Sequence, residues 1–199
     1  MSNGKKIKTA LISVYYKDGL DEIVTTLNKQ GVKIFSTGGT QSFIENLGIN
    51  VTPIEKLTGY PSILGGRVKT LHPKVFGGIL AIRDDEGHQS QLKEYDIQEI
   101  DLVIVDLYPF EETVKAKSTY EEIIEKIDIG GISLIRAAAK NHKDVVIIAS
   151  KDQYSRFLGI LNAGGGETSI DERLKFATEA FAVTSKYDTA IFGYFNKIK

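Results

Sequence analysis

The sequence predicts a single three-layer α/β domain, in which helices cover both faces of a mainly parallel sheet. Short apolar runs rich in β-branched residues alternate along the chain with stretches of helical period. Two of these runs, at residues 102–107 and 145–149, carry almost no polar residue, as expected for strands buried on both faces. Right-handed crossovers between parallel strands then place the connecting helices on both sides of the sheet.

The first quarter of the chain predicts three strands separated by two helices. The first strand covers residues 7–14, and the helix after it has apolar positions that begin at Leu20 and a C-terminal stop at Gly31. A second strand at residues 32–36 ends in small and hydroxyl-bearing residues. A short helix then leads to a third strand at residues 51–54.

Helical patterns surround the two buried runs in the rest of the chain. They occupy residues 120–127, 132–139 and 154–161, and a long final stretch from about 171 to 195. The alternation of strands and helices is that of one α/β unit, and no internal repeat interrupts it.

We therefore expect one domain over residues 1–199, with a core at about residues 5–150 and a helical C-terminal portion at about 151–199. Residues 58–96 fit this alternation poorly, because they are rich in Gly, Pro and His and have no clear period. A connection of that length inside a compact domain usually has a function. It is the first place to look for function.

Composition excludes several classes of site and partner. The 25 Lys and Arg nearly balance the 26 Asp and Glu, so no overall field favours nucleic acid or a membrane surface. The chain has no cysteine, which excludes disulfides, thiolate nucleophiles and cysteine-ligated metals and fits a cytoplasmic protein. No apolar run approaches the roughly 20 residues of a membrane helix, and the N-terminus lacks the cleavage site of a signal peptide.

Three loops follow the carboxyl ends of predicted strands, which is where open parallel sheets bind ligands. They lie at residues 15–19, 36–40 and 108–110, and we expect them to converge on one crevice. The loop Ser-Thr-Gly-Gly-Thr at 36–40 leads into a helix, so its amides and the helix dipole suit a phosphate. The alternative is a plain strand-to-helix turn, capped by Thr37 or Thr40.

Residues 65–73 form the most unusual segment, Gly-Gly-Arg-Val-Lys-Thr-Leu-His-Pro. Alternation along an extended stretch puts Arg67 and Lys69 on one side. There a guanidinium can hold a planar polar group while an ammonium adds a point charge. A solvated basic loop is the alternative, and the spacing leaves His72 open between a base and a structural hydrogen-bonding residue.

Asp128 and Lys140 flank a predicted helix at its two ends. Both residues suit the helix dipole, which by itself would account for them. Twelve positions along a straight helix span roughly 18 Å, so the two side chains can contact one small substrate only if both lie in bent flanking segments. Gly130, Gly131 and the region of Asn141 are where such bends would form.

Taken in order, these motifs resemble the inosine-monophosphate cyclohydrolase domain of the bifunctional purine-biosynthesis enzyme. The longest and most specific are the segment at residues 65–73 and Ala-Ala-Lys-Asn-His at residues 138–142. The matching segments together span almost the whole chain. They lie at residues 17–19, 36–40, 57–61, 64–73, 107–110, 127–131, 136–142 and 187–188.

The resemblance implies a methylglyoxal-synthase-like fold and a reaction that uses no cofactor and no metal. The substrate would be 5-formamidoimidazole-4-carboxamide ribonucleotide, whose carboxamide nitrogen attacks the formyl carbon; loss of water then gives inosine monophosphate. The functional partner would be a formyltransferase, usually a second, C-terminal domain of the family, for which 199 residues leave no room. Nucleic acid and membrane are not expected partners, and a homodimer is compatible with the resemblance.

The resemblance also assigns site residues by position. Lys140 would donate and accept the proton with Asp128 as its partner, while Lys69 and Tyr108 would orient the base and stabilise developing charge. The residues expected to bind the nucleotide are Tyr15, Lys17, Thr37, Gly38, Gly39, Thr40, Arg67, Val68, Thr70, Val105, Asp106, Ile129 and Gly130.

Two of these residues depart from the family pattern. Tyr15 stands where many relatives have a small hydroxyl residue that touches the phosphate, and only its backbone amide is expected to keep that contact. Asp106 stands where many relatives have Asn. An ionised Asp106 could not donate a hydrogen bond to the base, and its charge would favour a protonated neighbour.

Two alternatives from other classes remain open, because a fold does not fix function. One is an allosteric sensor of a nucleotide monophosphate, which would need the phosphate loop but not the combination of Lys140, Asp128 and Tyr108. The other is a methylglyoxal-synthase-like lyase that acts on a triose phosphate. Turnover of the formamido nucleotide separates both alternatives from a cyclohydrolase.

Overall fold

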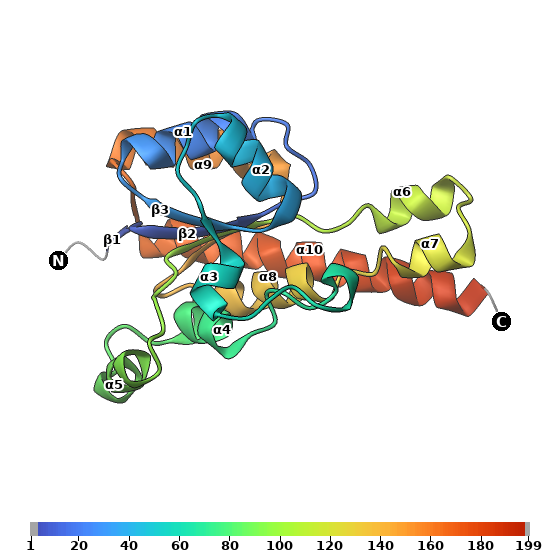
Figure 1. Ribbon diagram of the computed structural model, residues 1–199. Coiled ribbons are helices and arrows are strands. Elements are labelled where there is room, and N and C mark those ends of the chain that lie inside the picture. Colours follow the sequence, from blue (N-terminus) through green and yellow to red (C-terminus); the bar gives the residue numbers. More distant parts are fainter. Residues whose placement is uncertain (1–3, 198–199) are drawn as a thin grey trace.

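The computed structural model describes residues 4–197. At its centre is a five-stranded sheet in the order β4-β3-β2-β5-β6, in which every neighbouring pair of strands is parallel (Figure 1). The strands are β2 (Thr9–Ser13), β3 (Lys33–Ser36), β4 (Thr52–Pro53), β5 (Leu102–Val105) and β6 (Val146–Ile148).

The central strands are buried on both faces, as their apolar runs predict. All four residues of β5 are buried, and β2 pairs with β5 so that Ala10 lies opposite Leu102 and Ser13 opposite Val105. Removal of this continuous apolar surface from water is the main stabilising contribution to the domain. Because the strands are parallel, the carboxyl ends of β2, β3 and β5 meet at one edge of the sheet.

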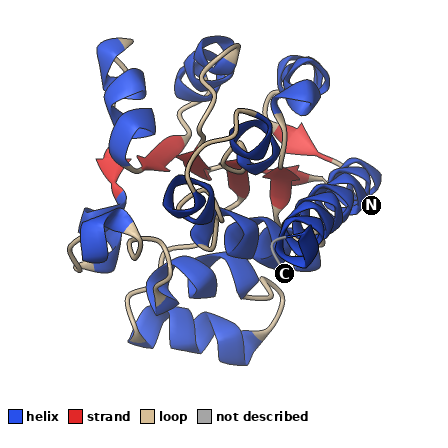
Figure 2. Cartoon of the chain, turned by 90° about the vertical axis from the view of Figure 1, so that its right-hand side faces the viewer, coloured by secondary structure: helices blue, strands red, loops and turns tan. Residues whose placement is uncertain are grey.

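Helices form a layer on each face of the sheet, which Figure 2 shows edge-on, and this confirms the predicted three-layer α/β arrangement. One layer contains α1 (Leu20–Lys29), α2 (Gly38–Asn46) and α9 (Tyr154–Gly164). The other contains α3 (Ile54–Thr58), α4 (Pro73–Leu80), α8 (Gly130–Lys140) and α10 (Ile170–Lys197). Among residues 4–197, no helix has both the length and the apolar character needed to cross a membrane.

The long helix α10 contributes to two hydrophobic cores. Its first turns pack into the main core through Phe176 and Ala180. Beyond the sheet, its later turns pack with α6 (Phe110–Lys115) and α7 (Tyr120–Ile124), which lie beside its projecting end in Figure 1. The buried residues of this second, smaller core are Phe110, Ile123 and Tyr187.

A separate two-stranded antiparallel sheet joins β1 (Lys5–Lys6) to β7 (Glu167–Thr168). The turn before β7 uses two glycines in the left-handed region, Gly165 at φ +56° and Gly166 at φ +88°. The sequence does not predict either strand, because two residues are too few for an alternating pattern.

Residues 58–96 are more regular than the sequence predicts. They contain the 3-10 turn η1 (Leu64–Gly66), helix α4 and helix α5 (Glu86–Glu94). His72 precedes α4, and its ring nitrogen Nδ1 accepts a hydrogen bond from the Lys74 amide at 3.1 Å. Of the two predicted roles for His72, the structural one is the one observed.

The glycines in α4 explain why the sequence does not predict this helix. A Cβ atom at Gly78 would lie only 2.3 Å from the carbonyl oxygen of Gln98, so the close approach of the two backbones requires glycine there. Gly is a poor helix former, and its presence in the segment breaks the helical pattern. Tertiary packing, rather than local preference, decides this helix.

Candidate functional site

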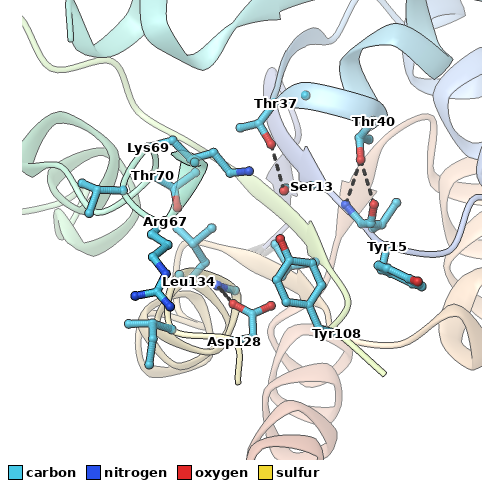
Figure 3. Close-up of a pocket in the computed structure, with 18 of the residues that line it drawn as sticks. Ser13, Tyr15, Thr37, Thr40, Arg67, Lys69, Thr70, Tyr108, Asp128 and Leu134 are labelled. Atoms are coloured by element: carbon cyan, nitrogen blue, oxygen red, sulfur yellow. Dashed lines mark hydrogen bonds between the residues drawn. The ribbon is translucent and has the colours of Figure 1, made fainter. Parts of the chain in front are cut away.

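A cavity of about 960 Å³ opens at the carboxyl edge of the sheet. The loops that follow β2, β3 and β5 line one side, and residues 64–71 and 124–131 line the other. Figure 3 shows Thr37 and Thr40 on the first side and Arg67, Lys69 and Thr70 across from them. The three loops therefore converge as the sequence predicts.

Hydroxyl groups join the loops that follow β2 and β3. The Ser13 and Thr37 hydroxyl oxygens lie 3.2 Å apart. The Thr40 hydroxyl accepts a hydrogen bond from the Val14 amide at 3.1 Å and donates one to the Val14 carbonyl at 2.9 Å. These contacts fix the first turn of α2 against the end of β2.

Helix α2 begins inside the predicted phosphate loop. Its N-cap residue is Thr37, whose side chain makes no capping hydrogen bond, and the Thr40 hydroxyl bonds to the backbone of Val14 just after β2. The side-chain cap given by the alternative interpretation of this loop is therefore not observed. The first amides of a helix have no partner within the helix. Here they include those of Gly38 and Gly39, which line the cavity.

Asp106 holds the loop after β2 by its backbone. Its carboxylate accepts hydrogen bonds from the amides of Tyr15 and Tyr16, the second at 2.9 Å. The Tyr15 amide is thus occupied, contrary to the expectation that it contacts a phosphate. Burial raises the pKa of Asp106, while the two amides and the Lys17 charge oppose the rise. Lys17 donates to the Tyr15 carbonyl at 3.0 Å, and partial burial lowers its pKa.

A cation and two aromatic rings form a cluster that the sequence does not predict. The rings of Tyr15 and Tyr108 meet edge to face, with centroids 5.9 Å apart. The Lys126 ammonium lies 5.5 Å from the first centroid and 5.6 Å from the second, which is within the range of cation–π attraction. No sequence spacing links these positions; only the packing of their segments brings them together.

Residues 64–71 present two cations in different ways. The Arg67 guanidinium pairs with the Glu125 carboxylate, and both side chains are exposed. Lys69 extends across the cavity toward the ends of the strands (Figure 3). The segment is closed by a short bridge in which the Ile63 amide donates to the Val68 carbonyl at 3.0 Å.

Asp128 sits in a turn that glycine makes possible. Its carboxylate accepts a hydrogen bond from the Gly131 amide at 2.6 Å. A Cβ atom at Gly131 would lie 2.5 Å from the Asp128 carboxylate, and one at Gly130 would lie 3.0 Å from the Thr70 hydroxyl. The glycine pair therefore lets the carboxylate and the 64–71 segment approach the start of α8.

The surroundings of Asp128 and Tyr108 change the pKa of both side chains. Burial raises the pKa of Asp128 and the Asp106 charge adds to the rise, while the hydrogen-bonded amides and the Lys69 charge oppose it. Burial also raises the pKa of Tyr108, with a smaller effect from Asp128. The cavity thus holds a carboxyl group of increased basicity next to a phenol that keeps its proton.

All the predicted site residues except Lys140 line this cavity. The catalytic candidates among them are Lys69, Tyr108 and Asp128. The nucleotide-binding candidates among them are Tyr15, Lys17, Thr37, Gly38, Gly39, Thr40, Arg67, Val68, Thr70, Val105, Asp106, Ile129 and Gly130. The lining residues that the sequence did not predict include Ser13, Val14, Leu71, Glu125, Lys126, Gly131 and Leu134.

Lys140 lies elsewhere. Helix α8 runs without a break from Gly130 to Lys140, and the exposed Lys140 side chain is at the opposite end of the helix from Asp128, outside the cavity. Eleven residues of α-helix span about 16 Å. The bends that would let Lys140 and Asp128 contact one small substrate do not occur between residues 130 and 140, so the expectation that they meet within one chain is corrected.

Comparison with known proteins assigns the family. A family model described as "MGS-like domain" matches residues 19–133, more than half of the chain. The chain belongs to the MGS-like domain family. A second model, described as "AICARFT/IMPCHase bienzyme", matches residues 138–199 of this MGS-like domain protein. The resemblance inferred from the motifs is confirmed.

Similar proteins span the same MGS-like domain and extend well beyond it. The "Bifunctional purine biosynthesis protein PurH" of Bacteroides thetaiotaomicron is 62% identical over 196 residues, which are 98% of this chain and 39% of that protein. The protein of the same name from Corynebacterium glutamicum is 50% identical over 192 residues, 96% of this chain and 36% of that protein. The chain thus spans less than two fifths of the length of these relatives.

A solved structure resembles the MGS-like domain over nearly all of both chains. It is described as "Crystal structure of ForH" and matches with a TM-score of 0.81 at 34% sequence identity. The match covers 94% of this chain and 96% of that one, so the two proteins share the whole fold.

Proposed function

We propose that this MGS-like domain is an inosine-monophosphate cyclohydrolase of purine biosynthesis. It would close the second ring of the purine by dehydrating 5-formamidoimidazole-4-carboxamide ribonucleotide. The observation that carries the proposal is a single cavity that holds Lys69, Tyr108 and Asp128 opposite the first turn of α2. The match to the AICARFT/IMPCHase bienzyme family and the name of the PurH relatives support the same reaction.

The phosphate of the substrate is proposed to bind at the start of α2. The amides of Gly38 and Gly39 lie at a helix N-terminus, where backbone donors and the helix dipole favour an anion. Thr37 and Lys17 also line the cavity, and their hydroxyl and ammonium groups can complete the set of donors. The cavity volume of about 960 Å³ suits a bound nucleotide.

The other end of the cavity is proposed to carry the proton transfers. As the ring closes, one proton leaves the carboxamide nitrogen and one leaves the formamide nitrogen, and the formyl oxygen departs with both as water. Asp128 is suited to take the first proton, because burial makes its carboxyl group a stronger base. Tyr108 and Lys69 are suited to stabilise the oxyanion that forms on the formyl carbon.

Lys140 has no part in this assignment of proton transfers. The resemblance gives it the role of proton donor and acceptor, but its side chain lies outside the cavity of its own chain. The role implied by the resemblance therefore remains a separate proposal, which substitution of Lys140 tests.

An ultraviolet assay for inosine monophosphate, run without added metal or folate, tests the function. We expect absorbance to rise with wild-type protein and to rise far more slowly with Asp128→Asn. No rise from well-folded wild-type protein would overturn the proposal. Binding of the nucleotide without turnover would then indicate the sensor, and consumption of dihydroxyacetone phosphate would indicate the lyase; neither alternative is favoured by the relatives.

We further propose the partners and conditions of the reaction. A formyltransferase, as a domain or as a separate protein, would supply the formamido substrate, which agrees with the bifunctional name of the relatives. The reaction would need no cofactor or metal and would take place in the cytoplasm, with no nucleic acid or membrane as partner. Homodimer formation is part of the proposal and is tested by sedimentation equilibrium.

A further inference from the structure

The Tyr187 hydroxyl bridges the backbone of residues 126–128. It donates a hydrogen bond to the Lys126 carbonyl at 2.6 Å and accepts one from the Asp128 amide at 2.9 Å. Because these two groups flank Ile127, one hydroxyl holds both ends of a three-residue segment. Tyr187 comes from α10, 59 positions beyond Asp128, so this contact depends on the tertiary fold.

Tyr187 is itself held firmly. Its side chain is 9% exposed, and its ring meets that of Phe110 edge to face with centroids 6.1 Å apart. Both rings belong to the small core that α6, α7 and α10 share. Burial raises the pKa of Tyr187 to about 12, so the hydroxyl keeps the proton that it donates.

The segment that Tyr187 holds carries two side chains that line the cavity. Lys126 stands over the two tyrosine rings of the cavity wall, and Asp128 bonds to the Gly131 amide. We propose that Tyr187 is a positioning residue: its hydroxyl fixes the backbone of residues 126–128 so that Asp128 faces the reacting nitrogen of the substrate. This inference rests on the proposed cyclohydrolase function and adds a residue outside the cavity to it.

A second tyrosine on α10 separates the effect of the hydroxyl from the effect of the ring. Tyr194 also packs edge to face on Phe110, with centroids 5.8 Å apart, and belongs to the same small core. Within residues 4–197, however, its hydroxyl makes no hydrogen bond. Ring packing in this core therefore does not require a bonded hydroxyl, and the two bonds of Tyr187 serve the 126–128 segment.

The kinetic test compares Tyr187→Phe with the matched control Tyr194→Phe in the full chain. Each change removes one hydroxyl and keeps the ring. We expect Tyr187→Phe to lower kcat about 10- to 100-fold, because small displacements of catalytic groups have effects of that size. The Kd for inosine monophosphate, measured by calorimetry, should change less than about threefold, because the phosphate end is untouched.

Tyr194→Phe should leave both kcat and Kd within about twofold of wild type, as a substitution away from a bonded site does. A kcat for Tyr187→Phe that matches that of Tyr194→Phe would overturn the proposal.

The pH profile distinguishes positioning from a general loss of stability. The titratable groups that face Asp128 are Lys69 from the 64–71 segment, Asp106 and Tyr108 after β5, and Tyr187 from α10. Without the bridge, the Asp128 carboxyl gains contact with water, and its pKa falls toward the ordinary value. The acid limb of kcat should then move to lower pH. A lower kcat with an unmoved limb and a matching loss of melting temperature would show a merely structural role.

A measurement that needs no turnover keeps this inference distinct from the proposed function. Carbon-13 NMR follows the titration of the Asp128 carboxyl in wild type and in both variants, and we expect a lower pKa in Tyr187→Phe alone. If wild type forms no inosine monophosphate but this shift is seen, the cyclohydrolase assignment fails and the positioning of Asp128 stands. An unshifted titration overturns the positioning role whatever the activity.

Discussion

Among single residues, the buried carboxyl group of Asp106 and the partly buried one of Asp128 have different neighbours in the cavity and different effects. Asp106 accepts from the amides of Tyr15 and Tyr16 and so stabilises a loop, whereas Asp128 is bound in the Gly131 turn beside Tyr108. The sequence predicts that both line the site but not which is structural, since that depends on amides that only the folded chain brings near. The Lys126 cluster was missed for the same reason.

Gly131→Ala tests how closely the Asp128 carboxylate must approach α8. The new Cβ would lie 2.5 Å from a carboxylate oxygen, so the side chain must turn away. We expect kcat to fall about 10- to 100-fold and the free energy of unfolding to fall by about 1–3 kcal/mol. Kinetics and thermal melts check both.

The control for this change is Gly193→Ala on α10, where nothing lies within 4 Å of the added Cβ. It should leave kcat unchanged and stabilise the helix by up to about 1 kcal/mol. Equal kcat values for Gly131→Ala and wild type would contradict the tight turn.

Glu125→Gln tests whether Glu125 competes with the substrate for Arg67. The two exposed side chains form an ion pair at the edge of the cavity, and a nucleotide that uses Arg67 must displace it. Loss of the charge should tighten inosine monophosphate binding about two- to fivefold, the range of an exposed pair. The gain should shrink at high salt, because salt screens the pair.

Calorimetry at two ionic strengths measures this effect, with Glu121→Gln in α7 as the control, since Glu125 is the C-cap residue of the same helix. Weaker binding by Glu125→Gln than by Glu121→Gln would show that Glu125 assists the ligand instead of competing with it.

Among the elements, those with a strong local pattern are the ones that the sequence predicts. The buried face of α1 and the fully apolar β5 appear as expected. Predicted strands run longer than observed: the segment 51–54 contains only the two residues of β4, because Ile54 already starts α3. Likewise α7 ends at Ile124, three residues before the predicted end. Element ends depend on tertiary contacts, which local pattern does not record.

Lys140→Ala tests the placement of Lys140 at the far end of α8. Because a charge about 16 Å along the helix is largely screened at physiological salt, the Kd for inosine monophosphate should stay within about twofold of wild type. Lys69→Ala, which removes a cation inside the cavity, should weaken binding about tenfold or more. Calorimetry compares the two.

The value of kcat for Lys140→Ala then settles its role. An unchanged kcat leaves the proton transfers to residues of the cavity. A lost kcat with unchanged binding supports the role that the resemblance assigns, acting from outside the cavity of its own chain. Binding weakened as much as by Lys69→Ala would contradict the placement of Lys140.

For the whole molecule, both the sheet and the small core beside it position segments of the site. The sheet edge supplies the loops of the phosphate end, while α6, α7 and α10 support the segment that carries Asp128. The cavity lies between these two supports. Burial at this junction raises the pKa of the Asp106 and Asp128 carboxyl groups. The raised pKa lowers the free energy of unfolding where the groups are ionised, but it also makes each carboxylate a stronger base.

Asp128→Asn tests that opposition. Since burial raises the folded-state pKa of Asp128 above its unfolded value of about 4, the folded state binds the proton more tightly, and the free energy of unfolding falls as pH rises through the raised pKa. The variant should therefore melt higher than wild type at neutral pH, with a difference that shrinks toward about pH 4, while turnover becomes far slower.

Thermal melts across this pH range measure the difference, with Asp171→Asn at the exposed start of α10 as the control. A lower melting temperature for Asp128→Asn than for wild type at neutral pH would mean that the ionised carboxylate stabilises the fold.

The sequence alone determined the α/β class, the family and more than half of the residues that line the cavity, because periodic burial and long motifs are local properties of the chain. Only the tertiary structure decided what those residues contact: that Lys140 lies apart from Asp128, that Asp106 occupies the Tyr15 amide, and that Tyr187 holds the 126–128 segment. These depend on distances between segments remote in sequence, which are set by packing of the whole chain.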